Sequence, residues 1–494
     1  MTGRDGFVAT AAKLASFSLA LGGTLCLLAF AGFFYEYGWT GRRQFKSPFY
    51  MALYYGGPLL GAVLLFAALR LRPIDRLKLL SALFSAGVSL YALEFLLEWR
   101  SSGLFASTRT VMSLLIESKD KQRQAAALSK QWGVAIDART ADETLADVQR
   151  TAADAIPIMT ASNHLFVSQD DGSLKSAISV DGREVMPLAG VANRVTLLCN
   201  ENGQWIDYRS DQRGFNNPPE VWRAEALEMA VVGDSFAHGY CVPGDKNFAA
   251  LIRQRHPATL NLGIAGDGPL LMLATLKEYL PALRPKTVLW FYYEGNDLTD
   301  LQVELKSPLL RNYLKNHFTQ SLLARQGDID RAMVGEIPRL KAQEQFNRKR
   351  SEENRAENRV GEFMRFSSLR GRLGMVGGRN VNDGGASQSA NLDVFRSIVR
   401  QANQQVHGWG GQLVFVYLPS WSRYTNDHAP EEAAHGDLVT LVHDLGIQVL
   451  DLTDAFQAHG DPLSLFPFRR PGHYNEMGHR LVAAEVLKTL AQGQ

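Results

Sequence analysis

The sequence predicts an α/β protein whose core is a five-stranded parallel sheet, preceded by helices that cross a membrane. After position 226, short and continuously apolar runs alternate with helical stretches, which is typical of parallel strands buried on both faces. Before position 100, apolar residues gather in segments of about 20 residues, the length that spans a bilayer as a helix. Because 494 residues exceed one ordinary domain, we expect these two patterns to belong to separate domains.

Residues 1–99 are expected to form a membrane region of three helices, at Leu14–Phe34, Phe49–Leu69 and Leu79–Leu97. A cleaved signal peptide is the alternative for the first segment, but its apolar run is too long and two more segments follow. The N-terminus and the second loop carry six Lys and Arg residues, against three in the first loop. The positive-inside rule then predicts a multi-pass protein of the bacterial inner membrane, with everything after Trp99 extracytoplasmic.

Residues 100–225 are expected to form a small α+β region on the outer side of the membrane. The composition of 119–151 favours helix, and Asp-Gly dipeptides at 171–172 and 181–182 indicate two β-hairpins.

Two of the three cysteines, Cys199 and Cys241, fall on the expected outer side, where disulfides persist. A bridge between them would tie the α+β region to the loop after the first strand of the sheet. Two free thiols are the alternative, and the sequence leaves both open.

Five apolar runs define the C-terminal domain, 226–494. The expected strands are Leu227–Val232, Thr259–Ile264, Thr287–Tyr293, Leu413–Leu418 and Ile447–Leu452. A segment at about 305–395 interrupts them, with ten basic and five acidic residues at 339–372 and Gly-Gly pairs after it. It is expected to be an insertion with a solvated helix and a flexible linker. A basic surface for an anionic polymer or lipid head group is the sharper alternative.

The first chemically informative motif is Gly233-Asp234-Ser235-Phe236, directly after the first expected strand. A serine at the carboxyl end of such a strand stands at the mouth of the sheet, where ligands bind in open α/β folds. Because a helix begins there, the backbone N–H of Ser235 also points toward incoming negative charge. Ser235 is therefore a candidate nucleophile and oxyanion donor, and a simple helix N-cap is the alternative.

Three further motifs follow in order along the chain. Gly266, after the second strand, can bring a bare backbone N–H close to a substrate, or can simply form a tight turn. Asn296, after the third strand, offers a side-chain amide as an oxyanion donor, or an Asn-Asp turn. His473, just before the last helix, can accept a serine proton, or can be a solvated loop histidine.

Together these four blocks resemble the SGNH/GDSL hydrolase family, which is named for Ser, Gly, Asn and His in this order. The resemblance covers about 226–304 and 410–492 and implies a flavodoxin-like, three-layer α/β/α domain. It also implies acyl transfer through a serine ester, with Ser235 as nucleophile and His473 as general base. Ser235, Gly266 and Asn296 would form the oxyanion hole. Asp234 and Asp297, within the first and third motifs, are candidate accessory residues.

One position departs from the family pattern, because Arg470 stands three residues before His473, where an aspartate usually completes the triad. Three alternatives follow. The site is a Ser-His dyad oriented by a backbone carbonyl, or another acid such as Asp461 or Glu476 substitutes, or the domain is inactive. Arg470 is also a candidate contact for an anionic substrate.

The leading functional hypothesis is a membrane-anchored esterase that acts on O-acyl esters of an extracytoplasmic glycan or another envelope substrate. The alternatives are an O-acyltransferase that receives acyl groups from a membrane partner, a lipase, and a non-catalytic glycan-binding scaffold. The expected partners are thus an acylated glycan or lipid and the membrane. No metal-ligand cluster or G-x-G-x-x-G fingerprint occurs, so neither a metal nor a cofactor is expected. A net charge of +2 gives no sign of nucleic-acid binding.

Overall fold

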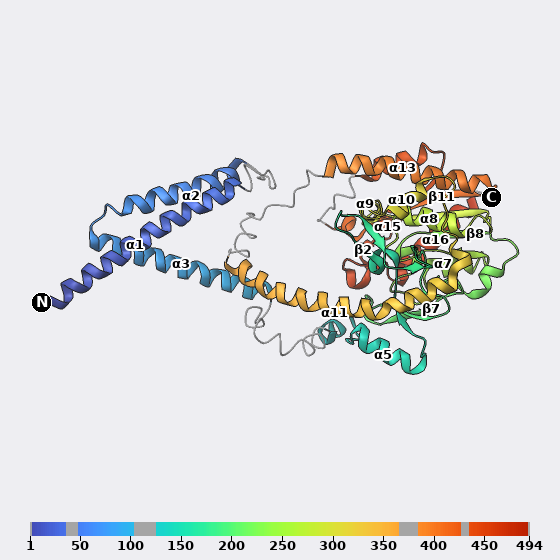
Figure 1. Cartoon of the computed structure of the whole chain (residues 1–494), viewed down its shortest axis with the longest axis horizontal. Coiled ribbons are helices and arrows are strands. Elements are labelled where there is room, and N and C mark those ends of the chain that lie inside the picture. The colour runs from blue at the N-terminus through green and yellow to red at the C-terminus, as the bar shows by residue number, and fades with distance from the viewer. Residues whose placement is uncertain (1, 36–47, 103–124, 365–383, 426–433, 493–494) are drawn as a thin grey trace. The chain divides into compact units, whose positions relative to one another are not determined.

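The computed structural model describes residues 2–35, 48–102, 125–364, 384–425 and 434–492 (Figure 1). The chain divides into two compact units. The first comprises 1–117 with 345–386, and the second comprises 118–344 with 387–494. The α+β region and the parallel sheet therefore belong to one unit.

The first unit contains helices α1 (Thr2–Phe33), α2 (Pro48–Ala68) and α3 (Pro73–Ser102), and α1 contacts both of the others. Within the described residues, two segments are long and apolar enough to cross a membrane, Thr10–Phe33 and Pro73–Glu94. In α2, where the second span was predicted, the described apolar segment is shorter, Tyr54–Ala68. The structure thus supports two spans, and the prediction of three is corrected.

The second unit is built on five parallel strands, as predicted. They are β8 (Met229–Val232), β9 (Thr259–Asn261), β10 (Thr287–Tyr293), β11 (Gln412–Leu418) and β12 (Gln448–Asp451). Their order in the sheet is β12-β11-β10-β8-β9, which is the flavodoxin-like order. The direction of winding reverses between β8 and β10, and a crevice opens at the carboxyl ends of the strands at such a switch point.

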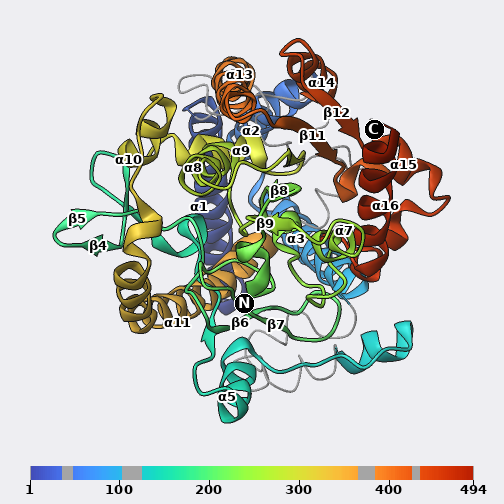
Figure 2. The same cartoon turned by 90° about the vertical axis from the view of Figure 1, so that its right-hand side faces the viewer.

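Alternate residues of the strands face two separate cores, as the period of two requires. Trp290 of β10 belongs to the core that is covered by α8 (Pro269–Tyr279), α13 (Gly384–Gly408) and α14 (His435–His443). Its neighbour Phe291 belongs to the core on the other face. There the sheet is covered by α7 (Phe248–Arg253), α15 (Thr453–Ala458) and α16 (Glu476–Gln492) (Figure 2). The unit is therefore a three-layer α/β/α structure.

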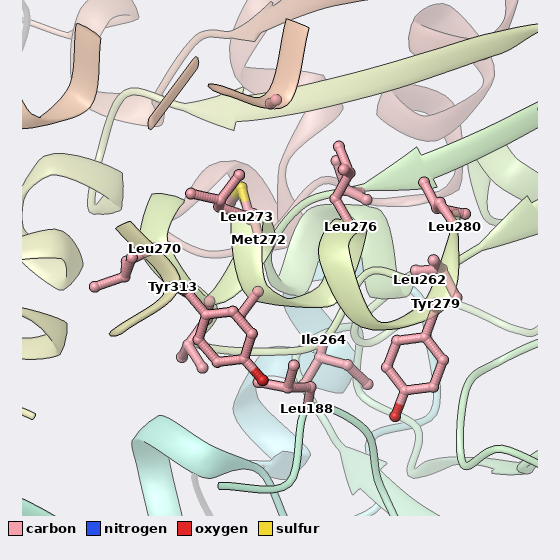
Figure 3. Packing of buried hydrophobic residues seen from close by; sticks show 14 of the residues in the cluster. Leu188, Leu262, Ile264, Leu270, Met272, Leu273, Leu276, Tyr279, Leu280 and Tyr313 are labelled. Atoms are coloured by element: carbon pink, nitrogen blue, oxygen red, sulfur yellow. The ribbon is translucent and has the colours of Figure 1, made fainter. Parts of the chain in front are cut away.

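The α+β region packs directly on this domain. Leu188 lies in the same buried cluster as Leu262, Ile264 and side chains of α8 (Figure 3). Its helix α5 and small sheet β1-β6-β7 are formed by Ala141–Thr151, Ile156–Pro157, Val195–Cys199 and Ile206–Arg209. One core is therefore continuous across residues 156–191 and the sheet, whereas α5, β6 and β7 pack in two smaller clusters of their own.

Both predicted hairpins of this region are confirmed. The strand pairs are β2 (Phe166–Ser168) with β3 (Leu174–Ser176), and β4 (Ser179–Val180) with β5 (Arg183–Glu184). The predicted helix at 119–151 is interrupted instead. Residues 125–132 are helical, Gly133 adopts a φ of +68°, and a capping box at Thr140 starts α5 anew. Residues 119–124 lie outside the described part.

The insertion contributes α10 (Pro308–Arg311) and the long helix α11 (Gln326–Met364). Ile329 and Met333, near the start of α11, are buried in the main core, so this end of the helix is anchored rather than solvated. Of the predicted linker, 365–383 lies outside the described residues, and α13 begins at Gly384. The remaining short elements are η2 (Ala161–Leu165), η3 (Pro219–Arg223), α6 (Ser235–His238), α9 (Asp297–Glu304), η4 (Asn312–Leu314), η5 (Leu322–Arg325), η6 (Trp421–Tyr424), η8 (Pro462–Leu465) and η9 (Pro467–Arg469).

Candidate active site

Ser235 stands at the carboxyl end of β8 and begins helix α6. Asp234 caps this helix by accepting a hydrogen bond from the backbone N–H of Phe236, at 2.9 Å. Gly233 is needed because a Cβ atom at this position would come within 2.7 Å of the Ala237 Cβ. The strand therefore turns sharply into the helix and leaves Ser235 at the mouth of the sheet, buried but lining a cavity.

His473 reaches this serine from the segment before α16. Its Nε2 atom lies 2.7 Å from the Oγ of Ser235, within hydrogen-bond reach for proton transfer. The next residue, Tyr474, is fully buried and donates a hydrogen bond from its hydroxyl to the Pro419 carbonyl at 2.6 Å. The histidine is thus fixed by the core directly behind it.

Glu201 supplies the carboxylate that the sequence motif lacks. It lies in the loop between β6 and β7 of the α+β region, and its Oε1 is 2.8 Å from the Nδ1 of His473. Its Oε2 accepts the backbone N–H of His473 at 2.9 Å. With Nδ1–H donating to this carboxylate, Nε2 is left as the acceptor for the Ser235 hydroxyl. The three side chains therefore form a continuous Ser-His-Glu chain.

The charge of Glu201 suits this role. Burial acts to raise the pKa of its carboxyl, but the hydrogen bonds and the charge of His473 outweigh burial and hold the pKa below its ordinary value. Glu201 is consequently a carboxylate near neutral pH and can stabilise an imidazolium.

The acids proposed as substitutes from the sequence are not at this place. Glu476 forms an ion pair with the Nζ of Lys246 at 3.0 Å, and Asp461 pairs with Arg469. Arg470 is exposed and does not line the cavity. Since His473 has a carboxylate partner, a dyad oriented by a backbone carbonyl is not what the structure shows either. Both rejected acids are near His473 in sequence, whereas Glu201 is 272 residues away.

The three candidate oxyanion donors also line the cavity, which has a volume of about 470 Å³. Within the described residues, the backbone N–H groups of Ser235 and Gly266 donate to no protein acceptor. Gly266 has a φ of +85°, and a Cβ there would overlap Ser162, so only glycine fits. Asn296 lines the same cavity, so its side-chain amide lies where it can donate to a ligand.

The two accessory aspartates support the loops rather than face a ligand. Asp234 is the cap of α6, and Asp297 accepts the backbone N–H of Tyr293 at 3.1 Å, which closes the turn after β10. Both are fully buried. Burial raises the pKa of Asp234 to about 6 and raises that of Asp297 well above its ordinary value. In the described part of the chain, no group of three or more His, Cys, Asp or Glu side chains is arranged to hold a metal ion.

A disulfide joins Cys199 and Cys241, with the Cα atoms 5.4 Å apart. It links the end of β6, two residues before Glu201, to the turn that follows α6. This pair of cysteines is also the one sequence signal that pointed toward Glu201. No motif marks the glutamate itself, because its position depends on packing between distant segments.

Comparison of the sequence with protein-family models and with curated proteins gave no match. Among solved structures, a two-domain esterase active on acetylated mannans is similar, with 12% identity and a TM-score of 0.29, over 55% of this chain and 52% of that one. This chain thus spans about half the length of that esterase. A member of the lipolytic G-D-S-L family from Veillonella parvula has 13% identity and a TM-score of 0.28, over 53% of this chain and 97% of that one. An acetyl xylan esterase has 11% identity and a TM-score of 0.29, over 53% and 98%.

The strand order and the positions of the four motif residues agree with the SGNH/GDSL resemblance. Ser235 follows β8 and Asn296 follows β10, so they flank the switch point of the sheet. Gly266 and His473 line the same cavity. The fold is thus the one expected of an SGNH/GDSL hydrolase, and the carboxylate that contacts His473 comes from the distant Glu201.

Proposed function

We propose that the protein is a membrane-anchored serine esterase that acts on O-acyl esters of an extracytoplasmic glycan. The observation that carries this proposal is the unbroken chain from Ser235 through His473 to Glu201, at a cavity that also presents unengaged oxyanion donors.

The reaction proceeds through a covalent acyl-enzyme. The Oγ of Ser235 attacks the ester carbonyl carbon while Nε2 of His473 takes the hydroxyl proton, and Glu201 stabilises the imidazolium. The N–H groups of Ser235 and Gly266 and the amide of Asn296 receive the oxyanion. The C–O bond then breaks, and His473 gives its proton to the leaving alkoxide. A water molecule attacks the acyl-enzyme in the same way and releases the acid.

The cavity walls favour a short acyl group on a hydroxyl-rich alcohol. Besides the reacting groups, Ser162, Asn163 and Asp300 contribute polar side chains, whereas Phe166 and Val303 are the larger apolar ones. A volume of about 470 Å³ with mixed lining accommodates a small acyl group and part of a sugar. A lipase would instead need a long apolar channel for the acyl chain.

Membrane attachment and an outer location are supported by three features. Two helices of the described chain are long and apolar enough to span a bilayer. With these two spans, the segment between them carries five Lys and Arg residues against one before the first span, so the positive-inside rule favours a cytoplasmic location for that segment and an extracytoplasmic second unit. The disulfide beside the site is of the kind that persists in an oxidising compartment such as the periplasm. We therefore place the protein in the bacterial inner membrane.

The test uses the full chain in detergent, a fluorophosphonate probe and a series of p-nitrophenyl esters. We expect wild-type protein to be labelled and to prefer acetate over decanoate, and we expect Ser235→Ala and His473→Ala to lose both activities. Ser168→Ala, in an exposed strand position away from the cavity, is the matched control and stays active. A folded wild-type protein that neither labels nor turns over would contradict the proposal, and a preference for decanoate would contradict the glycan assignment.

A further inference from the structure

We propose that the Cys199–Cys241 disulfide is a positioning device for catalysis: it holds Glu201 against His473, so that the triad is complete only while the bridge is oxidised. This inference rests on the proposed esterase function. It assigns a role to a bond that takes no part in the chemistry, and it makes activity dependent on the redox state of the compartment.

The bridge joins the two halves of the site over a short path. Cys199 is the last residue of β6, and Glu201 follows two positions later. At the other end, Cys241 lies in the turn that follows α6, the short helix that Ser235 begins. A covalent bond thus runs from the strand that carries the acid to the turn behind the nucleophile.

Few other polar contacts tie the loop between β6 and β7 to the C-terminal half of the chain. Within the described residues, only Glu201 and Asn202 of this loop make hydrogen bonds to the C-terminal half. Asn202 donates to the carbonyl of Cys241, which is itself part of the bridge, at 2.9 Å. The other hydrogen bonds of the loop end within 135–139 of the same α+β region. Without the bridge, the acid would depend largely on its own contact with the histidine.

The turn at the far end also needs restraint. Cys241 has a φ of +61°, a left-handed conformation that a residue with a side chain seldom adopts, and Gly239 has a φ of +81°. Between them, Tyr240 packs on the ring of His473, with the ring centroids 4.8 Å apart, and lines the cavity. The disulfide and the Asn202 hydrogen bond therefore fix the turn that supports the histidine as well as the loop that orients it.

Opening the bridge needs a reductant, for which a dithiol serves. One thiolate of the dithiol attacks a sulfur of the bridge, and its second thiolate then closes a cyclic disulfide. The two electrons reduce Cys199 and Cys241 to thiols, which take up the two protons that the dithiol loses. Glu201 is then free to move, and a displacement of about 1 Å is enough to weaken catalysis strongly.

The experiment is a kinetic cycle on the full chain in detergent with p-nitrophenyl acetate. Treatment with dithiothreitol, or the double substitution C199A/C241A, should lower kcat by about 10–100-fold, less than the ~10⁴-fold known for loss of a triad carboxylate, because Glu201 is displaced and not removed. KM should stay within about threefold, because neither cysteine nor Glu201 lines the cavity. In the Glu201→Gln background, the same treatments should cost less than about threefold more, since the group being positioned is already lost.

Two outcomes of this cycle would overturn the proposal. If reduction leaves kcat unchanged, the bridge does not position the acid. If reduction lowers kcat as much in Glu201→Gln as in wild type, its effect is general destabilisation. Cys26→Ala is the control, because Cys26 is the remaining cysteine, and the response to reductant must persist in it.

Hydrogen exchange of the same samples separates this proposal from the esterase assignment. The backbone N–H of His473 is bound by Glu201, so reduction should accelerate exchange in peptides that cover 200–205 and 471–474. Exchange in β10, at the centre of the sheet, should not change. Unchanged exchange in both peptides would refute the positioning role of the disulfide even if esterase activity is present. A wild type that hydrolyses no ester would refute the esterase function. The exchange data would still test whether the disulfide holds Glu201 against His473.

Discussion

The two sides of the active site are held in place by different means. On the nucleophile side, Ser235 and Asn296 follow adjacent strands of a sheet whose two faces are fully covered. On the acid side, Glu201 arrives on a hairpin loop of a small three-stranded sheet. Strand ends in a packed core need no further restraint, whereas the loop is fastened by one disulfide and a few hydrogen bonds.

The site is therefore divided between a rigid half, which carries Ser235 and Asn296, and an attached half, which carries Glu201. In the proposed mechanism, the rigid half performs bond making and holds the oxyanion. The attached half sets the tautomer of His473 and stabilises its charged form. Because the attached half is joined by few contacts, its contribution can be removed by small changes that leave the fold intact, and this makes the comparison testable.

The largest expected effect is that of Glu201→Gln. An amide cannot stabilise the imidazolium and can favour the wrong tautomer, so we expect kcat for p-nitrophenyl acetate to fall by about 10²–10⁴-fold with little change in KM. The melting temperature should change little, because Glu201 is partly exposed. Steady-state kinetics and a thermal melt of the full chain measure both quantities.

Glu476→Gln is the matched control, since it makes the same chemical change near His473 in sequence but removes only an ion pair with Lys246. Its kcat should stay within about threefold of wild type. If Glu476→Gln were the inactive variant and Glu201→Gln the active one, the acid has been assigned to the wrong side of the site.

The second effect tests the rigid half. Asn296→Ala removes one oxyanion donor, which should lower kcat by about 10²–10³-fold and slow fluorophosphonate labelling in proportion. The triad remains, so the residual rate should still fall further when Glu201→Gln is added. Asn312→Ala, outside the cavity, is the control. A loss in Asn296→Ala that appears in KM alone would mean that the amide binds the ground state instead of the oxyanion.

The rigid half is also the half that the sequence could predict. Continuous apolar runs place the five strands, and Ser235, Gly266 and Asn296 follow them within a few residues, so local order along the chain carries their positions. His473 is found because it precedes the last helix. The parallel order of the strands then brings all four together at one edge, as the structure shows.

Glu201 could not be found in this way, because its place depends on how the α+β region packs against the sheet. Sequence proximity to His473 suggested Asp461 and Glu476, but both point to cations instead. The cysteine pair was informative because a disulfide reports a long-range contact, and it lies two residues from the missing acid. The prediction of a third span was not supported, because the described apolar segment of α2, Tyr54–Ala68, is shorter than the two candidate spans.

The smallest expected effect concerns a half-buried carboxyl in the cavity wall, that of Asp300. Burial, together with the nearby charge of Asp234, raises the pKa of Asp300 from 3.8 to about 7. Between these two values the folded protein holds a proton that the unfolded chain has lost, so stability falls as the pH rises through this window. Asp300→Asn cannot ionise, and its melting temperature relative to wild type should therefore increase from pH 4.5 to pH 8. The expected gain is about 1–2 °C, the shift that about 1 kcal/mol produces in a unit of more than 300 residues.

Asp170→Asn is the control, because this aspartate is exposed in the turn between β2 and β3 and has no burial to relieve. Its difference from wild type should stay flat across the same pH range, monitored by tryptophan fluorescence, since Trp290 is buried at the centre of the sheet. A gain for Asp300→Asn that is equal at pH 4.5 and pH 8 would mean that the amide improves packing, and ionisation would not be the cause. A gain confined to high pH would show that ionisation of Asp300 lowers the stability of the rigid half, and that the packing of the surrounding core offsets this loss.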